Sequence, residues 1–420
     1  MSCAFLVSVP AAYAQTLGEN LQLLLKEHKR TLASNADVSA AEEQLSVAKG
    51  EWYPVFDATT NIGQERRNKP SGSADTNMVP RNLDLSVTQK LWDFGSTNAS
   101  IRRSQITLEQ AQVTREATLQ GLVVEGISAH LNVIRAYKVL QFFRGSTDNI
   151  KRQTELEDAR VQRGAGFSTD VLQAKTQLAG AQALEIQAEG ALKQTLNRYR
   201  AVFGYLPEDP SALKSPRLPL ELLPSSLDET VEQTLKNNPQ LHAARLGADI
   251  AREDIAVSRA DGFFPKVEAS AESNFKKDNG GTASGQQERL VKVEATFNFN
   301  LGATAINTLK ASEQSHLATT NRYGETRDGL EEQARNAWDN LQTARVNAEH
   351  LHNQANIAAE FLELARRERQ LGNRSLIDVL AGETALISAS SDAASADTNV
   401  ALAVYTLLSV IGVITADVVD

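Results

Sequence analysis

The chain has very few cysteine and aromatic residues. Among its 420 residues there is one cysteine, Cys3, and only 5% are Phe, Trp or Tyr. A single cysteine excludes an intramolecular disulfide framework, and so few large aromatic side chains are not typical of a compact globular core. Small residues and glutamine are abundant instead, which favours long helices packed closely side by side. The net charge of −9 argues against nucleic acid as a partner.

Long hydrophobic runs are also missing. No window holds the roughly 18 apolar residues that a membrane-spanning helix needs, so the sequence predicts no such helix. A chain of this kind can cross a membrane only through β-strands that close into a barrel, because the bilayer offers no partner for free backbone N–H and C=O groups.

Catalytic motifs are missing as well. The six histidines are scattered, and His350 and His352 point to different faces of a helix, which does not suit a metal pair. The glycine-rich stretch 279–285 lacks the Lys-Ser/Thr of a phosphate-binding loop and is interpreted as a hairpin loop. The sequence therefore predicts no enzymatic activity and no cofactor.

The first residues have the features of a signal peptide. Residues 3–9 form a short apolar run, and Ala12-Tyr13-Ala14 follows as a cleavage pattern before Gln15. We interpret residues 1–14 as a signal peptide with a truncated basic start; the alternative is a disordered N-terminus. Cys3 precedes the apolar run, so a lipoprotein anchor is not predicted.

The main feature that is present is an internal repeat with an offset of 208 residues. It aligns Gly164 with Gly372, Asp170 with Asp378 and Gly204 with Gly412, without a gap. We therefore divide the chain into repeat 1 (15–203), a linker with five prolines (204–226) and repeat 2 (227–420).

Four segments alternate between apolar and polar residues, the period of a β-strand. They are 55–66 and 82–92 in repeat 1, and 266–277 and 289–300 in repeat 2. Polar loops, 67–81 and 278–288, separate the two strands of each pair. Each segment has about the length that a tilted transmembrane strand requires.

The remaining sequence predicts long helices. The expected ranges are 18–50, 96–163, a return helix to about 203, 228–260 with a break at Asn238-Pro239, and 304–371. The last of these carries two heptad seams. One seam contains Leu330, Ala337, Ala344, Leu351, Ala358 and Ala365, and the other Ala334, Leu341, Ala348, Ala355 and Leu362. A 3.5-residue period predicts left-handed supercoiling.

Two arginine clusters lie on these helices. Arg102-Arg103 and Arg366-Arg367-Glu368-Arg369 are interpreted as solvated helix faces, and the second is alternatively part of a docking surface. A soluble coiled-coil rod would explain the heptads, but it has no use for four alternating strands.

The order of helix, strand pair, long helix, glycine turn and return helix resembles the TolC family of outer-membrane channel-tunnels. The motifs that carry the resemblance are Asn238-Pro239, the pairs Tyr53-Pro54 and Phe264-Pro265, and the two turns with their following Asp-Val-Leu. The resemblance implies a mainly α-helical chain with a membrane β-barrel. Three copies would form a twelve-stranded barrel in the outer membrane of a Gram-negative bacterium, continued by a helical coiled-coil tunnel in the periplasm.

The resemblance also implies a gate at the periplasmic end. Arg374 matches the family's gate arginine, Thr169 and Asp170 match its partners, and Asp378 matches an aspartate of the constriction ring, a possible cation ring. The expected contact joins Arg374 to the Thr169-Asp170 region across the subunit boundary. Ala381 and Arg369 replace a second ring aspartate and a gate tyrosine.

The glycine turns would lie at the same end and receive a periplasmic adaptor. The docking residues expected there are Gly164, Gly166, Ser168, Gly372, Asn373 and Ser375.

The segment 370–380, Gln-Leu-Gly-Asn-Arg-Ser-Leu-Ile-Asp-Val-Leu, looks more like family members of type I secretion systems. We therefore expect an exit duct that passes protein substrates from an inner-membrane pump, either an ABC transporter or an RND pump, through an adaptor. The alternative is the outer-membrane component of a multidrug efflux pump. A more remote alternative is a periplasmic coiled-coil structural protein.

Overall fold

The computed structural model describes residues 16–70, 74–165 and 167–419. The expected signal peptide, Cys3 and Gly166 lie outside the described residues. The chain forms two compact units. One comprises Met1–Ala33, Glu116–Pro239 and Arg327–Asp420, and the other comprises Ser34–Arg115 and Gln240–Thr326. Each unit takes segments from both sequence repeats.

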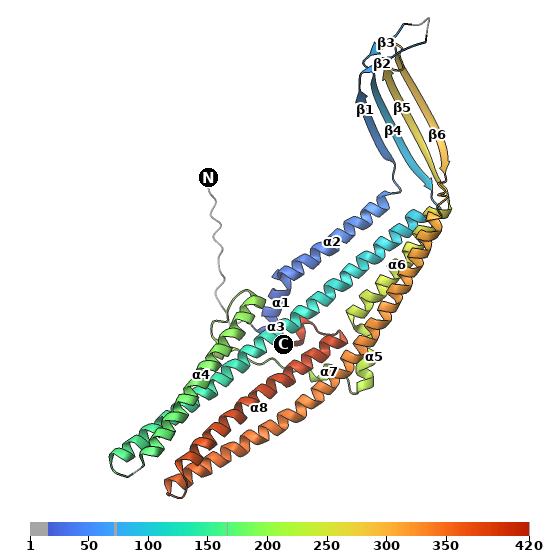
Figure 1. The fold of residues 1–420 in the computed structure, drawn as a ribbon. Helices are drawn as coiled ribbons and strands as arrows, with labels where there is room; N and C mark the ends of the chain where they lie inside the picture. Colours follow the sequence, from blue (N-terminus) through green and yellow to red (C-terminus); the bar gives the residue numbers. More distant parts are fainter. Residues whose placement is uncertain (1–15, 71–73, 166, 420) are drawn as a thin grey trace. The chain divides into compact units, whose positions relative to one another are not determined.

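The long helices carry the internal repeat (Figure 1). Helices α3 (Ser96–Gln162) and α7 (Thr304–Gln370) each have 67 residues, and α4 (Ser168–Phe203) and α8 (Leu376–Ile411) each have 36. Both pairs begin 208 residues apart, as the sequence predicts. All eleven heptad positions of α7 are buried or half-buried, because supercoiled helices turn this seam toward their neighbours.

The shorter helices are broken near their first third. Helix α5 (Leu227–Asn237) ends before α6 (Pro239–Phe263), as predicted, since Pro239 lacks the N–H that would continue the helix. The prediction of one helix over 18–50 is wrong. Helices α1 (Leu17–Glu27) and α2 (Lys29–Gly50) are separated at His28, whose ring Nδ1 accepts the Arg30 N–H at 3.1 Å and caps α2.

The linker is held against the helices of the first unit. It contains two short 3₁₀ turns, η1 (Pro210–Ala212) and η2 (Leu220–Leu222). The Tyr405 hydroxyl donates to the Arg217 carbonyl at 2.9 Å, and the His130 ring Nε2 lies 2.9 Å from the Lys214 carbonyl. A third turn, η3 (Ala416–Val419), follows α8.

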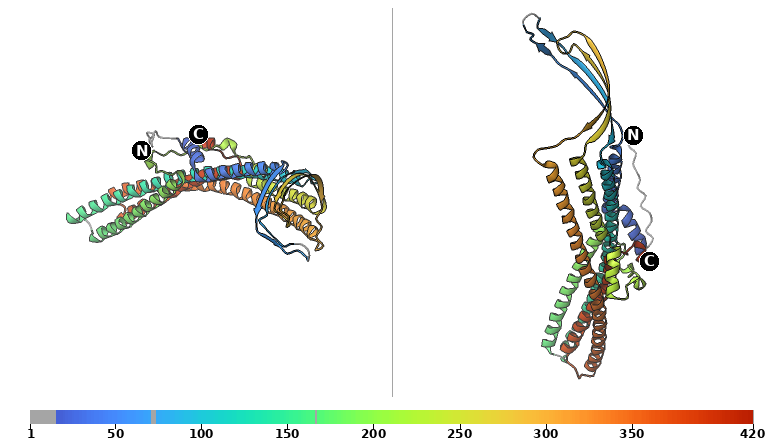
Figure 2. Two further views of the ribbon diagram at one scale, coloured as in Figure 1. Left: turned by 90° about the horizontal axis from the view of Figure 1, so that it is seen from above. Right: turned by 90° about the vertical axis from the view of Figure 1, so that its right-hand side faces the viewer.

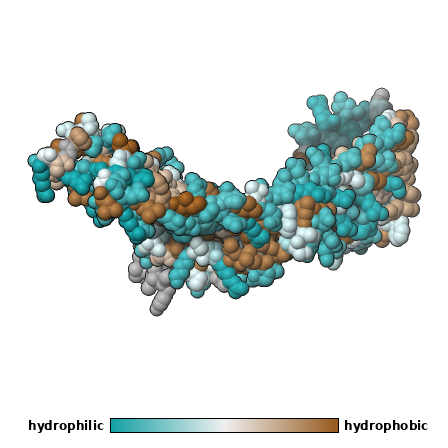
Figure 3. Space-filling view, turned by 90° about the horizontal axis from the view of Figure 1, so that it is seen from below, coloured by the Kyte–Doolittle hydropathy of each residue, from teal (hydrophilic) through white to brown (hydrophobic). Residues whose placement is uncertain are grey.

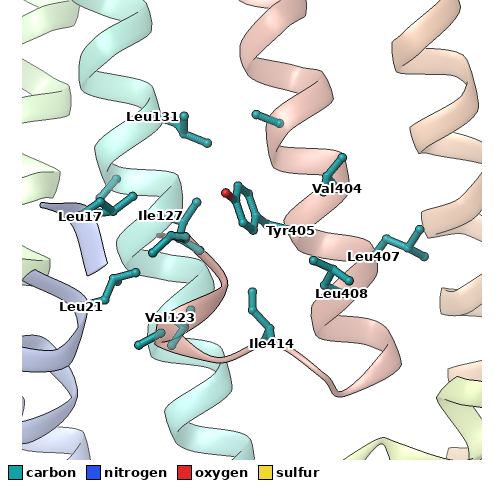
Figure 4. Close-up of a cluster of buried hydrophobic side chains, with 14 of the residues drawn as sticks. Leu17, Leu21, Val123, Ile127, Leu131, Val404, Tyr405, Leu407, Leu408 and Ile414 are labelled. Atoms are coloured by element: carbon teal, nitrogen blue, oxygen red, sulfur yellow. The ribbon is translucent and has the colours of Figure 1, made fainter. Parts of the chain in front are cut away.

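The main hydrophobic core of this unit lies between α1, α3 and α8 (Figure 4). Figure 4 shows Leu21, Val123 and Ile127 facing Tyr405 and Leu408. Leu21, Ile127, Tyr405 and Leu408 are at most 1% exposed, so each contributes about 1.5–3 kcal/mol through burial.

Four strands form an antiparallel sheet in the second unit, with the order β1-β4-β5-β6 (labelled in Figure 1 and seen from two other sides in Figure 2). The four strands are β1 (Val55–Ile62), β4 (Arg81–Trp92), β5 (Lys266–Lys277) and β6 (Gly285–Thr296). Strand β4 of repeat 1 pairs with β5 of repeat 2, so the sheet joins the two repeats.

Three strand boundaries differ from the prediction. β1 ends at Ile62, and the expected loop 67–81 contains β3 (Thr76–Met78), which pairs with β2 (Glu65–Arg67). β6 runs over 285–296 rather than 289–300, because the pairing with β5 begins at Lys277 and Gly285, directly after the loop 278–284. In that loop the Asp278 N–H donates to the Ser284 carbonyl at 3.0 Å.

The two faces of the sheet differ in chemistry. The register places Phe56, Leu83, Val87, Phe275 and Val291 on one face, and each of these side chains is at least 40% exposed. The opposite face carries acidic residues such as Asp57, Asp84, Glu272 and Glu294. An exposed apolar face of this size needs a partner or a lipid environment.

The expectation that no helix is apolar enough to span a membrane is wrong for α8. Among the described residues, α8 is the one helix that is long and apolar enough to span a membrane, judged by length and composition alone. Half of its apolar window (50%) is buried inside the chain, which is the behaviour of a core helix. Its Ala, Val, Leu and Ile residues raise its mean hydropathy, and Ser, Thr, Asp and Asn residues interrupt them, so that no long run of large apolar side chains forms. The face drawn in Figure 3 is likewise a mosaic of hydrophilic surface and separate hydrophobic patches.

Gly204 and Gly412 are equivalent positions of the two repeats and differ in how closely other residues pack against them. Both end a 36-residue helix with a left-handed backbone, φ 83° and 84°. A Cβ on Gly412 would lie 2.7 Å from the Asn237 carbonyl oxygen, whereas a Cβ on Gly204 meets nothing within 4 Å. Both Gly→Ala variants should lose about 1–2 kcal/mol from the strained φ.

Gly412→Ala should lose a further 1–3 kcal/mol or so from the backbone clash. Chemical unfolding of the two variants measures the difference. Equal losses would contradict the packing of Gly412 against the α5–α6 break.

Candidate functional site at the tips of the helical hairpins

Both tip turns are Schellman motifs, in which a left-handed glycine ends a helix. In the first, Gly164 (φ 76°) donates to the Val161 carbonyl and Ala165 donates to the Arg160 carbonyl, at 2.9 and 3.0 Å. In the second, Gly372 (φ 82°) and Asn373 make the equivalent bonds to Arg369 and Glu368. The two turns therefore have the same backbone geometry, as their alignment in the sequence predicts.

The helices that follow begin differently. Ser375 caps α8, because its Oγ accepts the Asp378 N–H at 3.2 Å, as predicted. Phe167 precedes α4 and makes no side-chain cap. Ser168, Thr169 and Asp378 are exposed and Asp170 is half-exposed. Gly164, Gly372, Asn373 and Ser375 are also exposed, so the described residues of these turns are open to a partner.

Arg374 is held by its own hairpin in the single chain. Its Nε donates to Glu368 Oε2 at 2.6 Å, and its guanidinium lies 5.4 Å from the centroid of the Phe361 ring. Among the described residues of the single chain, no hydrogen bond or ion pair joins Arg374 to Thr169 or Asp170. The expected contact across a subunit boundary stays a prediction.

Arg369 joins the two hairpins through Glu157, a residue that the sequence analysis does not single out. Arg369 Nη2 binds Glu157 Oε1 at 2.8 Å, and Arg160 binds the same oxygen at 3.2 Å. The Glu157 side chain is only 6% exposed. Arg369 also donates to the Arg374 carbonyl at 3.2 Å, so it holds the backbone of the tip turn.

A second buried carboxylate, Glu383, joins three helices. It accepts hydrogen bonds from Arg366 of α7 and from Asn149 of α3, the latter at 2.7 Å. Its side chain is also 6% exposed. The interpretation as a solvated helix face is therefore wrong for Arg369, whose side chain is 24% exposed. Arg366 remains 40% exposed while it binds Glu383, and Arg367 pairs with Glu363 on the surface. An unpaired charge at either buried site would carry a large desolvation cost.

The sequence contains one signal for Glu157. The offset of 208 aligns it with Ala365, a buried heptad position of α7. A carboxylate in a buried seam needs a cation opposite, and the arginines of segment 366–369 supply it. The sequence alone does not say which helix of the other hairpin lies nearby.

Small hydrophobic clusters complete the packing near the tips. One joins α3, α4 and α8 and contains Ile150, Ala174, Ala181, Leu376 and Leu380. The other joins α7 and α8 and contains Leu362, Ala365 and Val379. Near the tips, the two hairpins are thus connected by a few apolar contacts, the buried Arg369–Glu157 ion pair and the hydrogen bond from Asn149 to Glu383, rather than by a large core.

Comparisons with known proteins agree with this architecture. The profile of the family described as "Outer membrane efflux protein" matches residues 20–205 and 230–413, and the chain therefore belongs to this family. The chain is 24% identical over 417 residues to the outer membrane protein TolC of Vibrio cholerae, covering 98% of this chain and 94% of that protein.

Two further comparisons are informative. The alkaline protease secretion protein AprF of Pseudomonas aeruginosa is 24% identical over 323 residues, 74% of this chain and 65% of that protein. The crystal structure of the Campylobacter jejuni CmeC outer membrane channel superimposes with a TM-score of 0.82 at 15% identity, covering 94% of this chain and 85% of that one.

The family membership defines the fold and the location. The chain is an outer-membrane channel protein and not an enzyme. In this fold, three copies close a β-barrel in the outer membrane, and their helices continue it as a tunnel through the periplasm. Channels of this family work with a periplasmic adaptor and an inner-membrane pump.

Proposed function

We propose that this channel is the exit duct of a type I secretion system and passes protein substrates from the cytoplasm to the exterior. The observation that carries the proposal is the tip segment 370–380, together with the similarity to a protein named for alkaline protease secretion. The second candidate is a component of a multidrug efflux pump, which the family description favours.

Deletion of the gene separates the two candidates. Type I export moves its cargo in one step, so loss of the duct should remove one or a few proteins from the medium and leave them inside the cell. The secreted and cellular proteomes measure this, and drug susceptibility is measured on the same strains. A deletion strain with an unchanged secretome and increased drug sensitivity would favour the efflux function instead.

The tip turns are proposed to dock the adaptor. Phe167 and Leu371 lie in the two turns, and both are 75% exposed. Large apolar side chains with this exposure are typical of a surface that a partner covers. The polar backbone of the turns around Gly164, Gly166, Ser168, Gly372, Asn373 and Ser375 would surround them.

We further propose that Thr169, Asp170, Arg374 and Asp378 form the periplasmic gate, with the three copies of Asp378 forming a cation ring. Arg374 has two candidate anions: Glu368 of its own hairpin and Asp170 of a neighbouring copy. The Arg374–Glu368 pair is half-exposed, and pairs of this kind contribute about 0.2–1 kcal/mol. Three copies would add about 0.6–3 kcal/mol, which biases a gate toward the closed state without locking it.

Single-channel conductance tests the gate. Arg374→Ser should raise conductance, because it removes the cation from both possible pairs. Glu368→Gln should reproduce this effect if the contact within the hairpin holds the gate, and Asp170→Ala should reproduce it if the contact between copies does. Arg367→Gln, which changes an exposed pair on the same helix, is the matched control. Wild-type conductance of Arg374→Ser would exclude Arg374 from the gate.

A further inference from the structure

The apolar face of the sheet carries a separate group of cations. The register places Ile62, Arg81, Lys277 and Gly285 in one row at the loop end of this face. The following rows contain Leu83 with Phe275, and then Ser273 with Arg289. Arg81, Lys277 and Arg289 are the three charged residues of the paired positions on this face, and all lie in its first three rows from the loops.

These cations have no anion to neutralise them. Within the described residues, no carboxylate lies within ion-pair distance of Arg81, Lys277 or Arg289. The acidic residues of the strands point to the opposite face. Lys276 illustrates the contrast, because it lies on that face and pairs with Glu288 at 3.7 Å.

Arg81 and Lys277 are direct cross-strand partners. Like charges in this position destabilise a sheet, so the pair has a cost within the isolated chain. Both belong to the central strands β4 and β5, whereas neighbouring copies can pair only with the edge strands β1 and β6. The missing anion is therefore not expected from another copy of the chain.

The position of the cations along the strands corresponds to a membrane surface. Arg81 and Trp92 are the first and last of the 12 residues of β4, about 36 Å apart along the strand. A tilt of about 40° reduces this to about 28 Å, close to the ~25 Å apolar band of an outer-membrane barrel. Aromatic residues gather at the helix end of the strands: Tyr53, Trp92, Phe94, Phe264, Phe297 and Phe299. They form the interfacial belt of one leaflet.

The cations then lie at the headgroup level of the other leaflet. The helices that leave the sheet belong to the periplasmic tunnel, so the loop end faces the cell exterior. A hollow of about 450 Å³ at this end has Arg81, Leu83, Phe275 and Lys277 in its lining. Cations next to apolar side chains suit a ligand that has an anionic head and hydrocarbon chains.

We propose that Arg81, Lys277 and Arg289 bind the phosphate groups of a lipid of the outer leaflet, a phosphorylated glycolipid of the lipid A type. The cations take the phosphates, and Leu83 and Phe275 contact the beginning of the acyl chains. This lipid supplies the anion that the like-charged pair lacks, and it stabilises the barrel at its exterior rim.

Binding of lipid A to the purified full-length trimer in detergent tests the proposal. The probes are bisphosphorylated lipid A, its dephosphorylated form and inorganic phosphate. Arg81→Gln and Lys277→Gln should each weaken binding of bisphosphorylated lipid A roughly fivefold, as expected for one cation at a membrane surface. Dephosphorylated lipid A should bind the wild type more weakly than the single variants bind the phosphorylated form, because it lacks the anions of all three cations.

Lys292→Gln is the matched control, because it removes a cation of the opposite face, outside the hollow, and should leave binding unchanged. Arg81→Lys and Lys277→Arg keep the charge and should retain binding. If Lys277→Gln does not form trimers, binding is measured with Arg81→Gln and Arg289→Gln instead. Wild-type affinity in Arg81→Gln and Lys277→Gln, an equal loss in Lys292→Gln, or full competition by inorganic phosphate would each overturn the lipid site.

Discussion

The structure depends on the unmet hydrogen bonds of a four-stranded sheet. One chain leaves β1 and β6 as open edges, and every residue of both strands is exposed. In a bilayer, unpaired backbone groups at such edges cost several kcal/mol each, so an open sheet cannot stay there. Four strands are too few to close a barrel, and closure requires other copies of the chain. This requirement makes the trimer a condition of membrane insertion.

The helices also leave groups without partners in a single chain, but these groups are apolar side chains and their exposure costs less. Long helices with alanine-rich seams approach closely, but their apolar side chains do not all find partners within the chain. Ile186, Val346, Ile357 and Leu364 are more than half exposed and are available to neighbouring copies. At the tips, contacts become fewer, and the Arg369–Glu157 ion pair and the Asn149–Glu383 hydrogen bond hold the two hairpins together. A tip connected by few contacts can change its arrangement at a small free-energy cost, as a gate requires.

The sequence predicts features with a strong local cause. The glycine turns, the Ser375 cap and the ends of the long helices follow from left-handed φ, capping and heptads, and all agree with the structure to within about a residue. The His28 break was missed because a histidine ring is an unusual cap. The start of β6 was missed because Gln286, Gln287 and Glu288 do not alternate, and only pairing with β5 identifies them as strand.

Contacts of the site between segments that are distant in the sequence could not be predicted from the sequence. Glu157 and Glu383 become recognisable only when α3 is known to lie beside α7 and α8. The neighbouring cations Arg81 and Lys277 could not be predicted either, since they are 196 positions apart in the chain and are brought together only by the β4–β5 register.

Disulfide crosslinking between the open edges tests the trimer most directly. In a Cys3→Ser background, a cysteine at Thr59 of β1 is combined with one of a series on β6, at Glu288, Leu290, Lys292 or Glu294. All of these positions lie on the polar face, so one register should bring a pair together. A closed ring predicts covalent dimers and trimers after oxidation in the membrane and nothing larger. Monomers at every position, or a ladder that continues beyond three chains, would contradict the closed trimeric barrel.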